Sequence, residues 1–321
     1  MVKSMLKINA LLLALFAVVM VGCNTNEDPV NPGTTPNPPT VLMATSVNET
    51  TVGLKWTAPT NPSATSYEVT ATPTNGGTSV VKEFTTTSGS VNGLVANTEY
   101  TFTVKSLNGT AKSTTGAVIK WAGAARYTTN ITLYETASSN GSGLQFPNTA
   151  GLRIAQGGQW DICLDTRDSG GEPSFDIGSP TKSSYTDNAG KFPNGDQARV
   201  TMIGKTWSGV ASLDNVYESV DLSQAAGLSE ALINFNAANT AGAPFAFVVK
   251  TASGNFAKVL VKASNGKLLQ GTSPNRYVDL EVSYQSGANL PYALKGNVAV
   301  APFKRPVDGG LVETNFKKAT N

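Results

Sequence analysis

The sequence predicts a mainly β protein, a β-sandwich followed by a second, mostly antiparallel β domain with minor helix. Many short stretches alternate apolar and polar residues, and this period of two is that of strands with one buried face. Charged residues make up only 14% of the chain, while Gly, Thr, Ser and Asn abound between the stretches, as in exported β proteins with many turns. The roughly 280 residues beyond the N-terminal region are enough for two domains.

Residues 1–22 carry the features of an export signal. Lys3 and Lys7 precede a mostly aliphatic run from Ala10 to Gly22, which is shorter than the about 20 apolar residues that a membrane-spanning helix needs. A basic start, an apolar core of this length and a small residue before the cleavage point are typical of a secretory signal peptide. We therefore expect residues 1–22 to be removed.

The segment Met20-Val21-Gly22-Cys23 resembles the lipobox of bacterial lipoproteins, with Met20 in place of the usual Leu. The resemblance implies that Cys23 is lipidated on sulfur, becomes the new N-terminus and anchors the protein at a membrane through acyl chains. In well-studied bacteria an Asp directly after this cysteine marks inner-membrane retention. Asn24 stands there instead, which favours the outer membrane, in a leaflet that the sequence leaves open. The alternative is ordinary secretion with an incidental Cys23.

Residues 23–39 are predicted to form a tether. The tract is rich in Asn and Thr and contains five prolines, which are Pro29, Pro32, Pro36, Pro38 and Pro39. Such a composition favours extended conformers and offers no hydrophobic core. At about 3.1 Å per residue it could hold a folded domain up to roughly 50 Å from the membrane.

Residues 40–121 are predicted to form the sandwich. Apolar residues alternate with small or polar ones in "TTVGLKWTAP", "TSYEVTATP" and "GLVANTEYTFTVKS". Asn75-Gly76-Gly77 and Asn108-Gly109 supply the positive-φ residues of tight turns between such stretches. Seven strands at this spacing imply a sandwich of two sheets.

The same residues resemble a fibronectin type III domain over their whole length. The resemblance is carried by Trp56, Ala58-Pro59, Tyr67, Leu94, Thr98, Tyr100, Phe102 and Val104. In that family the first tryptophan fills the core between the sheets, and the Leu and Tyr form the corner where the chain crosses between them. The loop at 107–110, where an integrin-binding Arg-Gly-Asp would be expected, reads Leu-Asn-Gly-Thr. The resemblance therefore implies a spacer or adhesive module.

Residues 122–321 are predicted to form the second domain, with longer strands and loops. Its clearest part is Phe245 to Lys262, in which Thr251 to Asn255 is a hairpin turn between two apolar runs. The stretch Leu228 to Asn236 is the one helical candidate. The strand at Trp160-Asp161-Ile162, and the hairpin together with "YVDLEVSY", resemble the HmuY-like family of bacterial surface lipoproteins over about a third of the domain. That family is known for haem capture.

The haem of the best-known HmuY-like proteins is held by two histidines, and this chain contains none. Methionine can serve as an axial ligand, but the mature chain offers only Met43 and Met202. We therefore expect no haem and no other cofactor. If the fold is shared, the pocket holds another ligand or nothing.

Catalysis has few candidate residues. A chain without histidine lacks the commonest general base at neutral pH and the histidine of nucleophile triads. Asp161 and Asp165 share a strand face with Cys163 between them, but four residues of strand separate them by about 13 Å, whereas glycosidase carboxylates lie about 5 to 9.5 Å apart. The two acids disfavour the Cys163 thiolate, so we interpret it as a structural thiol. With Cys23 as the only other cysteine, no intramolecular disulfide is expected.

Two acidic loops and one aromatic pair remain open alternatives. The oxygen ligands for calcium would be Asp165, Asp168, Glu172 and Asp176 in one loop, and Asp187, Asn188 and Asp196 in the other. Neither loop fits the twelve-residue calcium pattern, and solvated turns have the same composition, so no metal site is assigned. Trp207 and Tyr217 could form a platform for sugars, or could be buried aromatics.

The predicted function is that of a non-enzymatic, membrane-anchored lipoprotein that presents a ligand-binding or partner-binding domain on a spacer. Cleavage after Gly22 removes Lys3 and Lys7, so the mature chain carries 22 basic and 22 acidic residues, and a neutral chain gives no support for nucleic-acid binding. The ligand could be a small molecule, a glycan or a protein. The alternatives are a carbohydrate-binding or carbohydrate-active lipoprotein, and a structural or adhesive envelope protein.

Overall fold

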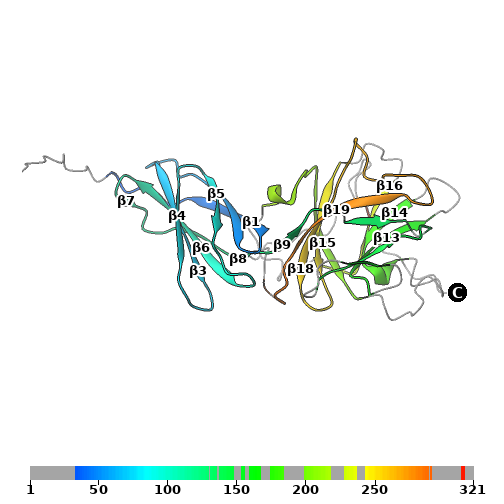
Figure 1. Ribbon diagram of the computed structural model, residues 1–321. Helices are drawn as coiled ribbons and strands as arrows, with labels where there is room; N and C mark the ends of the chain where they lie inside the picture. Colours follow the sequence, from blue (N-terminus) through cyan, green and yellow to red (C-terminus); the bar gives the residue numbers. More distant parts are fainter. Residues whose placement is uncertain are drawn as a thin grey trace, which may run out of the picture.

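The computed structural model describes residues 33–129, 131–135, 137–147, 153–155, 159–167, 174–183, 199–217, 228–236, 243–288, 290 and 312–314. The signal peptide predicted at 1–22 and the predicted lipidation site Cys23 therefore lie outside the described residues. The described residues form two β bodies that lie end to end, with strand β9 (Ala125–Tyr127) at their junction (Figure 1). Among them, no helix is long and apolar enough to cross a membrane.

The first body is a sandwich of two antiparallel sheets. One sheet has the strand order β1-β2-β5, and the other has the order β4-β3-β6-β7 with β8 also on β6. Since β7 and β8 both pair with β6, they act as one strand that is interrupted at 113–116. The strands are β1 (Thr40–Asn48), β2 (Thr51–Thr57), β3 (Ser66–Pro73), β4 (Val80–Phe84), β5 (Ser88–Asn92), β6 (Glu99–Asn108), β7 (Ala111–Lys112) and β8 (Ala117–Ala122).

The core of this sandwich is built as the sequence predicts. Trp56 lies between the sheets, 3% exposed, with its ring 5.2 Å from that of Tyr67 at an interplanar angle of 66°. The hydroxyl of Tyr100 accepts a hydrogen bond of 2.9 Å from the backbone N–H of Val95, which ties the predicted corner. The predicted turn contains Gly76, whose φ of 86° favours glycine.

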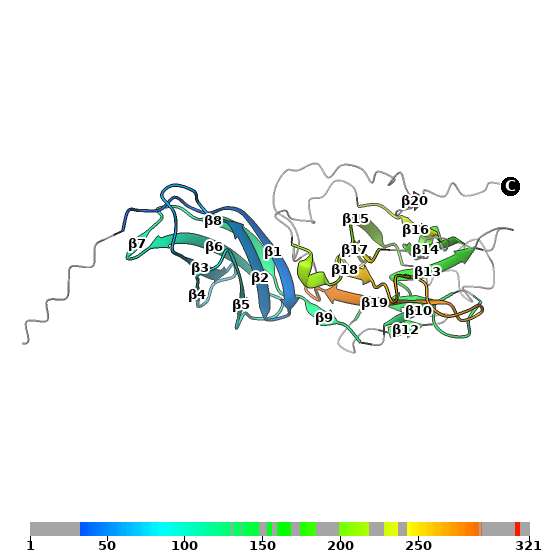
Figure 2. The same cartoon turned by 90° about the horizontal axis from the view of Figure 1, so that it is seen from above.

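The second body is also a sandwich (Figure 2). One sheet has the order β10-β19-β18-β17-β15 with β9 also on β19, and the other has the order β12-β11-β13-β14-β16-β20. The strands are β10 (Thr132–Tyr134), β11 (Gly143–Gln145), β12 (Arg153–Ala155), β13 (Ile162–Arg167), β14 (Ser174–Gly178), β15 (Met202–Ser208), β16 (Leu232–Asn236), β17 (Phe245–Lys250), β18 (Phe256–Val261), β19 (Tyr277–Tyr284) and β20 (Val312–Thr314). One hydrophobic core joins the inner faces of both sheets. The predicted hairpin turn joins β17 to β18, closed by a 2.9 Å hydrogen bond from the N–H of Thr251 to the carbonyl of Asn255.

The predicted helix at Leu228 to Asn236 is wrong. This segment contains β16, which pairs with β14 on one side and β20 on the other, and Ser229 forms a bridge to Ile203. Alternate side chains of β16, those of Ile233 and Phe235, enter the core. Backbone pairing with a strand on each edge stabilises this segment as a strand. These contacts with residues remote in sequence outweigh the local helical pattern, which reflects only neighbouring residues. The helical turns of the described residues are the 3-10 turns η1 (Pro180–Lys182) and η2 (Leu213–Asn215).

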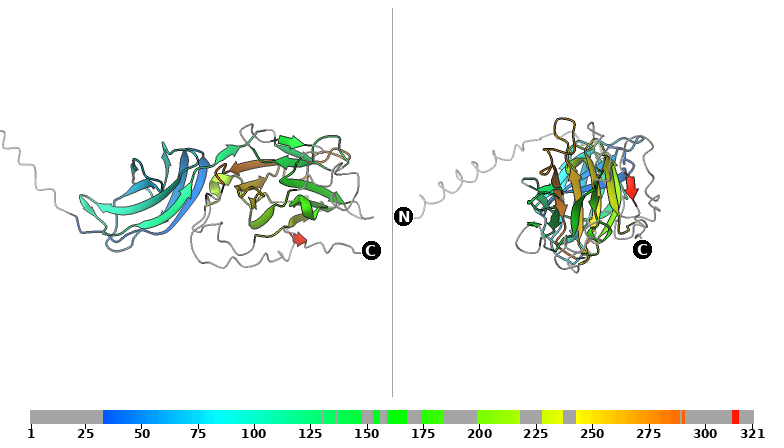
Figure 3. Two further views of the ribbon diagram at one scale, coloured as in Figure 1. Left: turned by 90° about the horizontal axis from the view of Figure 1, so that it is seen from below. Right: turned by 90° about the vertical axis from the view of Figure 1, so that its right-hand side faces the viewer.

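The two bodies share a packed interface. All six residues of β18 are buried, and because strand side chains alternate, every second one faces away from the core of the second sandwich. On that outer face Phe256 packs into the core of the first body. The Lys258 ammonium lies 5.3 Å from the ring centroid of Trp121 in β8 and 5.5 Å from that of Trp207 in β15. Figure 3 shows the two bodies joined end to end along the long axis.

Arg126 in β9 ties the junction together. Its guanidinium contacts the Glu281 carboxylate of β19 at 2.5 Å, donates to the Ser46 carbonyl of β1 at 2.6 Å, and lies 3.0 Å from the Asp214 carboxylate of η2. Just before it, the chain passes so close to the β1–β2 turn that a Cβ on Gly123 would lie 2.3 Å from a backbone oxygen of that turn. The connection is therefore short and directly packed.

Candidate functional site: a pocket between the two bodies

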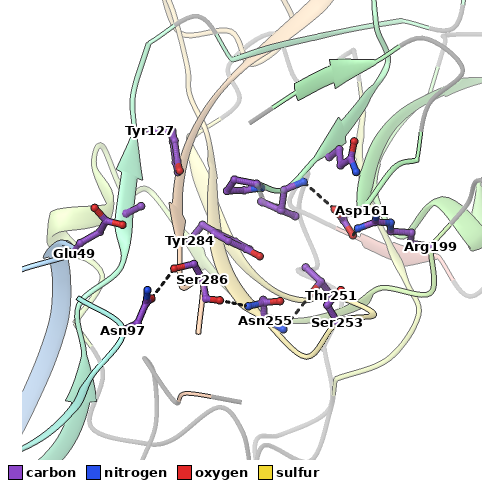
Figure 4. Close-up of a pocket in the computed structure, with 14 residues that line it drawn as sticks. Glu49, Asn97, Tyr127, Asp161, Arg199, Thr251, Ser253, Asn255, Tyr284 and Ser286 are labelled. Carbon is purple, nitrogen blue, oxygen red and sulfur yellow. Dashed lines mark hydrogen bonds and ion pairs between the residues drawn. The ribbon is translucent and has the colours of Figure 1, made fainter. Parts of the chain in front are cut away.

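A pocket of about 630 Å³ opens at the junction (Figure 4). Its residues come from the loops of the first sandwich, from β9, and from the strand ends and the hairpin turn of the second sandwich. They are Glu49, Asn97, Ala125, Tyr127, Gln145, Phe146, Pro147, Asp161, Arg199, Thr251, Ser253, Asn255, Tyr284 and Ser286. The volume falls in the range of small-molecule sites.

One wall holds an ion pair whose carboxylate is buried. Asp161 lies just before β13, with its side chain 1% exposed. Its Oδ2 accepts a 2.8 Å hydrogen bond from the N–H of Phe146, and its Oδ1 lies 3.4 Å from Nη1 of Arg199. Burial raises the pKa of the Asp161 carboxyl, and the Phe146 N–H and Arg199 offset that rise only in part.

The raised pKa of Asp161 can be tested through the pH dependence of the free energy of unfolding. Between the folded-state pKa and the ordinary value of 3.8, the folded state binds a proton that the unfolded state releases. We therefore expect the wild-type protein to gain stability relative to Asp161→Asn as the pH falls through this window. At neutral pH the variant should be as stable as the wild type or more so, because it removes the desolvation of a carboxylate that burial disfavours, and the Arg199 side chain, 28% exposed, remains partly solvated. Urea unfolding at a series of pH values measures the free energy of unfolding of the wild type and the variant. Parallel profiles of this free energy against pH would contradict the raised pKa of Asp161.

A second wall is aromatic. The rings of Phe146 and Tyr284 stack with centroids 5.4 Å apart and an interplanar angle of 4°. Burial raises the pKa of Tyr284 to about 12, with smaller contributions from Asp161 and Tyr127. Burial, followed by the nearby Glu49 carboxylate, also raises the pKa of Tyr127. Both hydroxyls are therefore protonated hydrogen-bond donors at neutral pH.

The third wall connects the hairpin turn to the first sandwich. The side-chain amide of Asn255 donates to the carbonyls of Gln285 at 3.2 Å and Ser286 at 2.9 Å. The hydroxyl of Ser286 donates to Oδ1 of Asn97, in the β5–β6 loop, at 2.6 Å. The first body thus supplies part of the lining through Asn97, and through Glu49 in the β1–β2 turn.

The structure brings only one residue of the predicted acidic pair to this pocket. Asp161 lines it, whereas Asp165 is buried in β13 directly opposite Asp176 of β14. Burial, followed by Asp165 and Asp176, raises the pKa of the Cys163 thiol well above its ordinary value. The thiolate is disfavoured as predicted, although the second acid is Asp176 rather than Asp161.

Of the predicted calcium ligands, Asp165 and Asp176 are brought together. The side-chain amide of Asn234 in β16 donates to Asp176 at 2.8 Å. Asp168, Glu172, Asp187, Asn188 and Asp196 lie outside the described residues. Within the described ranges, no group of three or more His, Cys, Asp or Glu side chains could hold a metal ion.

Of the predicted aromatic pair, Trp207 has a packing role. Trp207 packs against two hydrophobic clusters and lies over Lys258, and neither Trp207 nor Tyr217 lines the pocket. The sequence interpretation missed the other polar and aromatic lining residues, because each stands in an ordinary strand end or loop. The sequence predicts the strand that ends at Tyr284, but it does not indicate that Tyr284 lines a pocket.

Comparisons with known proteins identify the first body. The fibronectin type III domain family matches residues 37–135. Chitinase A1 from Niallia circulans is 33% identical over 159 residues, which cover 48% of this chain and 21% of that protein. This chain thus spans about a fifth of the length of that relative.

Solved fibronectin type III domains are also similar. The FN5 domain of Drosophila Lar is 22% identical with a TM-score of 0.25, covering 28% of this chain and 97% of that chain. A domain of human collagen XX is 23% identical with a TM-score of 0.25, covering 28% of this chain and 92% of that chain. The fold assignment depends on the family match and on the sheets described above.

Proposed function

We propose that this chain, whose first folded body is a fibronectin type III domain, is a non-enzymatic lipoprotein of the bacterial outer membrane that binds a small ligand in the pocket between its two bodies. The observation that carries the proposal is the pocket of about 630 Å³ at the junction, lined by polar side chains and a stacked aromatic pair. Such a combination is typical of small-molecule sites. Anchoring through Cys23 and the tether at 23–39 supports presentation of this pocket away from the membrane.

The acids of the pocket favour binding over hydrolysis. Asp161 is 1% exposed at its side chain, and both of its oxygens are engaged, one by the Phe146 N–H and one by Arg199. A carboxyl held in this way orients the pocket wall, and its two contacts compete with proton transfer to a bound molecule. Glu49, the other acid among the described lining residues, belongs to an exposed turn of the first body.

A second candidate is a carbohydrate-active role. The match to a protein named chitinase A1 favours it. Because this chain spans about a fifth of that relative, the match supports a shared module more than a shared activity.

Blocking the pocket tests the proposed function. Ser253 lies exposed in the β17–β18 turn and lines the pocket, whereas the neighbouring exposed Ala252 does not. We expect Ser253→Trp to fill the pocket without unfolding the protein, and Ala252→Trp to leave it open. The purified proteins would be incubated with a small-molecule extract of the producing cells' envelope and analysed by native mass spectrometry. The wild type and Ala252→Trp should retain an adduct that Ser253→Trp loses.

Two outcomes would contradict this function. One is the absence of any adduct on the wild-type protein. The other is an adduct that Ser253→Trp retains, because that molecule would be bound elsewhere.

A further inference from the structure

We propose that the pocket between the two bodies binds a neutral polyhydroxylated molecule, a saccharide, and that the fibronectin type III domain forms one wall of the binding site. This inference rests on the proposed function and names the ligand class of that site.

The charges of the lining disfavour an ionic ligand. Among the residues that the structure describes, three charged side chains line the pocket, Glu49, Asp161 and Arg199. The Arg199 guanidinium is already paired with the Asp161 carboxylate, so among these described side chains a phosphate, sulfate or carboxylate ligand would meet no uncompensated cation. Glu49 is exposed, and water and salt screen its attraction for a cation. The charges of the lining therefore favour a neutral ligand over an anion or a cation.

Two buried polar groups point to a ligand with hydroxyls. Asn255 is 6% exposed, and its amide N–H groups are used by the carbonyls of Gln285 and Ser286. This fixes the carboxamide and leaves Oδ1 as an acceptor to which no described residue donates. Tyr284 is 5% exposed, and its hydroxyl likewise has no hydrogen-bond partner among the described residues. Both residues line the pocket (Figure 4), so an acceptor and a donor are available to one ligand.

The rest of the lining suits a sugar ring. A saccharide hydroxyl both donates and accepts, and side-chain amides and hydroxyls do the same. The lining groups of this kind are Asn97, Gln145, Thr251, Ser253 and Ser286. The Phe146–Tyr284 stack adds an aromatic surface, whose electron-rich faces accept the C–H groups of a pyranose ring.

Both bodies take part in the site. Asn97 of the first body is held by the Ser286 hydroxyl at 2.6 Å, and Glu49 lies close enough to Tyr127 of β9 to raise its pKa. The fibronectin type III domain therefore closes the pocket, rather than serving only as the spacer that its sequence predicts.

A panel of purified ligands tests the inference. The probes are the neutral sugars glucose, galactose, N-acetylglucosamine, cellobiose and N,N'-diacetylchitobiose, the anions glucose 6-phosphate and glucuronate, and the cation glucosamine. Binding to the full chain is measured by calorimetry and by ligand-observed NMR. We expect at least one neutral sugar to bind more tightly than any charged probe.

Three variants locate the binding. Tyr284→Phe keeps the stack and removes only the hydroxyl, so it should weaken binding of that sugar about tenfold. Tyr134→Phe, in β10 and away from the pocket, is the matched control and should leave the affinity unchanged. Ala252→Trp, exposed in the β17–β18 turn and outside the lining, should also leave the neutral sugar's affinity unchanged.

The outcomes separate the inference from the function on which it rests. Preferential binding of an anion or cation, or an envelope adduct blocked by Ser253→Trp that is not a saccharide, would overturn the ligand class and leave the binding function standing. Sugar binding that Tyr284→Phe does not weaken would overturn the site. If neither the envelope extract nor the sugar panel yields a ligand, both proposals fail.

Discussion

Arg126→Met is expected to lower the free energy of unfolding by about 3–5 kcal/mol, the usual cost of removing one partner of a buried ion pair. The variant would leave the Glu281 carboxylate, 10% exposed at its side chain, without the guanidinium that lies 2.5 Å away. It would also remove the bond to the Ser46 carbonyl of the first body. Urea unfolding followed by fluorescence measures the loss, because Trp56 lies in the core of one body, Trp160 is buried in the other, and Trp121 and Trp207 lie at the junction.

The control is the double variant Arg126→Met with Glu281→Met. Replacing both charges by apolar side chains of similar size leaves no unpaired buried charge, so most of the lost stability should return. Glu281→Gln, which retains an acceptor for the guanidinium, should cost less than Arg126→Met. A loss below about 1 kcal/mol for Arg126→Met would place this pair among solvent-screened surface pairs and would contradict its role at the junction.

Cys23→Ala is expected to abolish the lipidated form of the protein completely. Each acyl CH₂ that enters a bilayer contributes about 0.8 kcal/mol, and lasting anchoring needs more than one chain, so the loss of the thiol removes the whole anchor. Intact-mass analysis should find acyl mass on the wild type and none on the variant. Cell fractionation should find the acylated protein in the outer membrane.

Two matched variants complete this test. Cys163→Ala changes the other cysteine, which is buried, and should leave lipidation intact. Asn24→Asp should move the lipidated protein to the inner membrane. An unmodified Cys23 in the wild-type protein would refute the anchor.

The first sandwich could be predicted in detail because its signals are local. Trp56 and Tyr67 lie on β2 and β3, which follow one another along the chain. The corner joins Tyr100 to Val95, which is only five residues away. The turn glycines likewise act within their own hairpins. By contrast, the helix predicted at 228–236 failed because the partners of β16 are β14 and β20, which lie far along the chain.

The sequence by itself determined the β class, the identity of the first domain and the expectation of an N-terminal anchor, because alternation, turns and leader composition are properties of short segments. Only the tertiary structure decided where a ligand could bind. The hydrogen bond between Asn97 and Ser286 joins residues 189 positions apart, and Asp161 meets Arg199 across 38 positions. Docking of the two sandwiches brings these side chains together, and no local pattern encodes that docking.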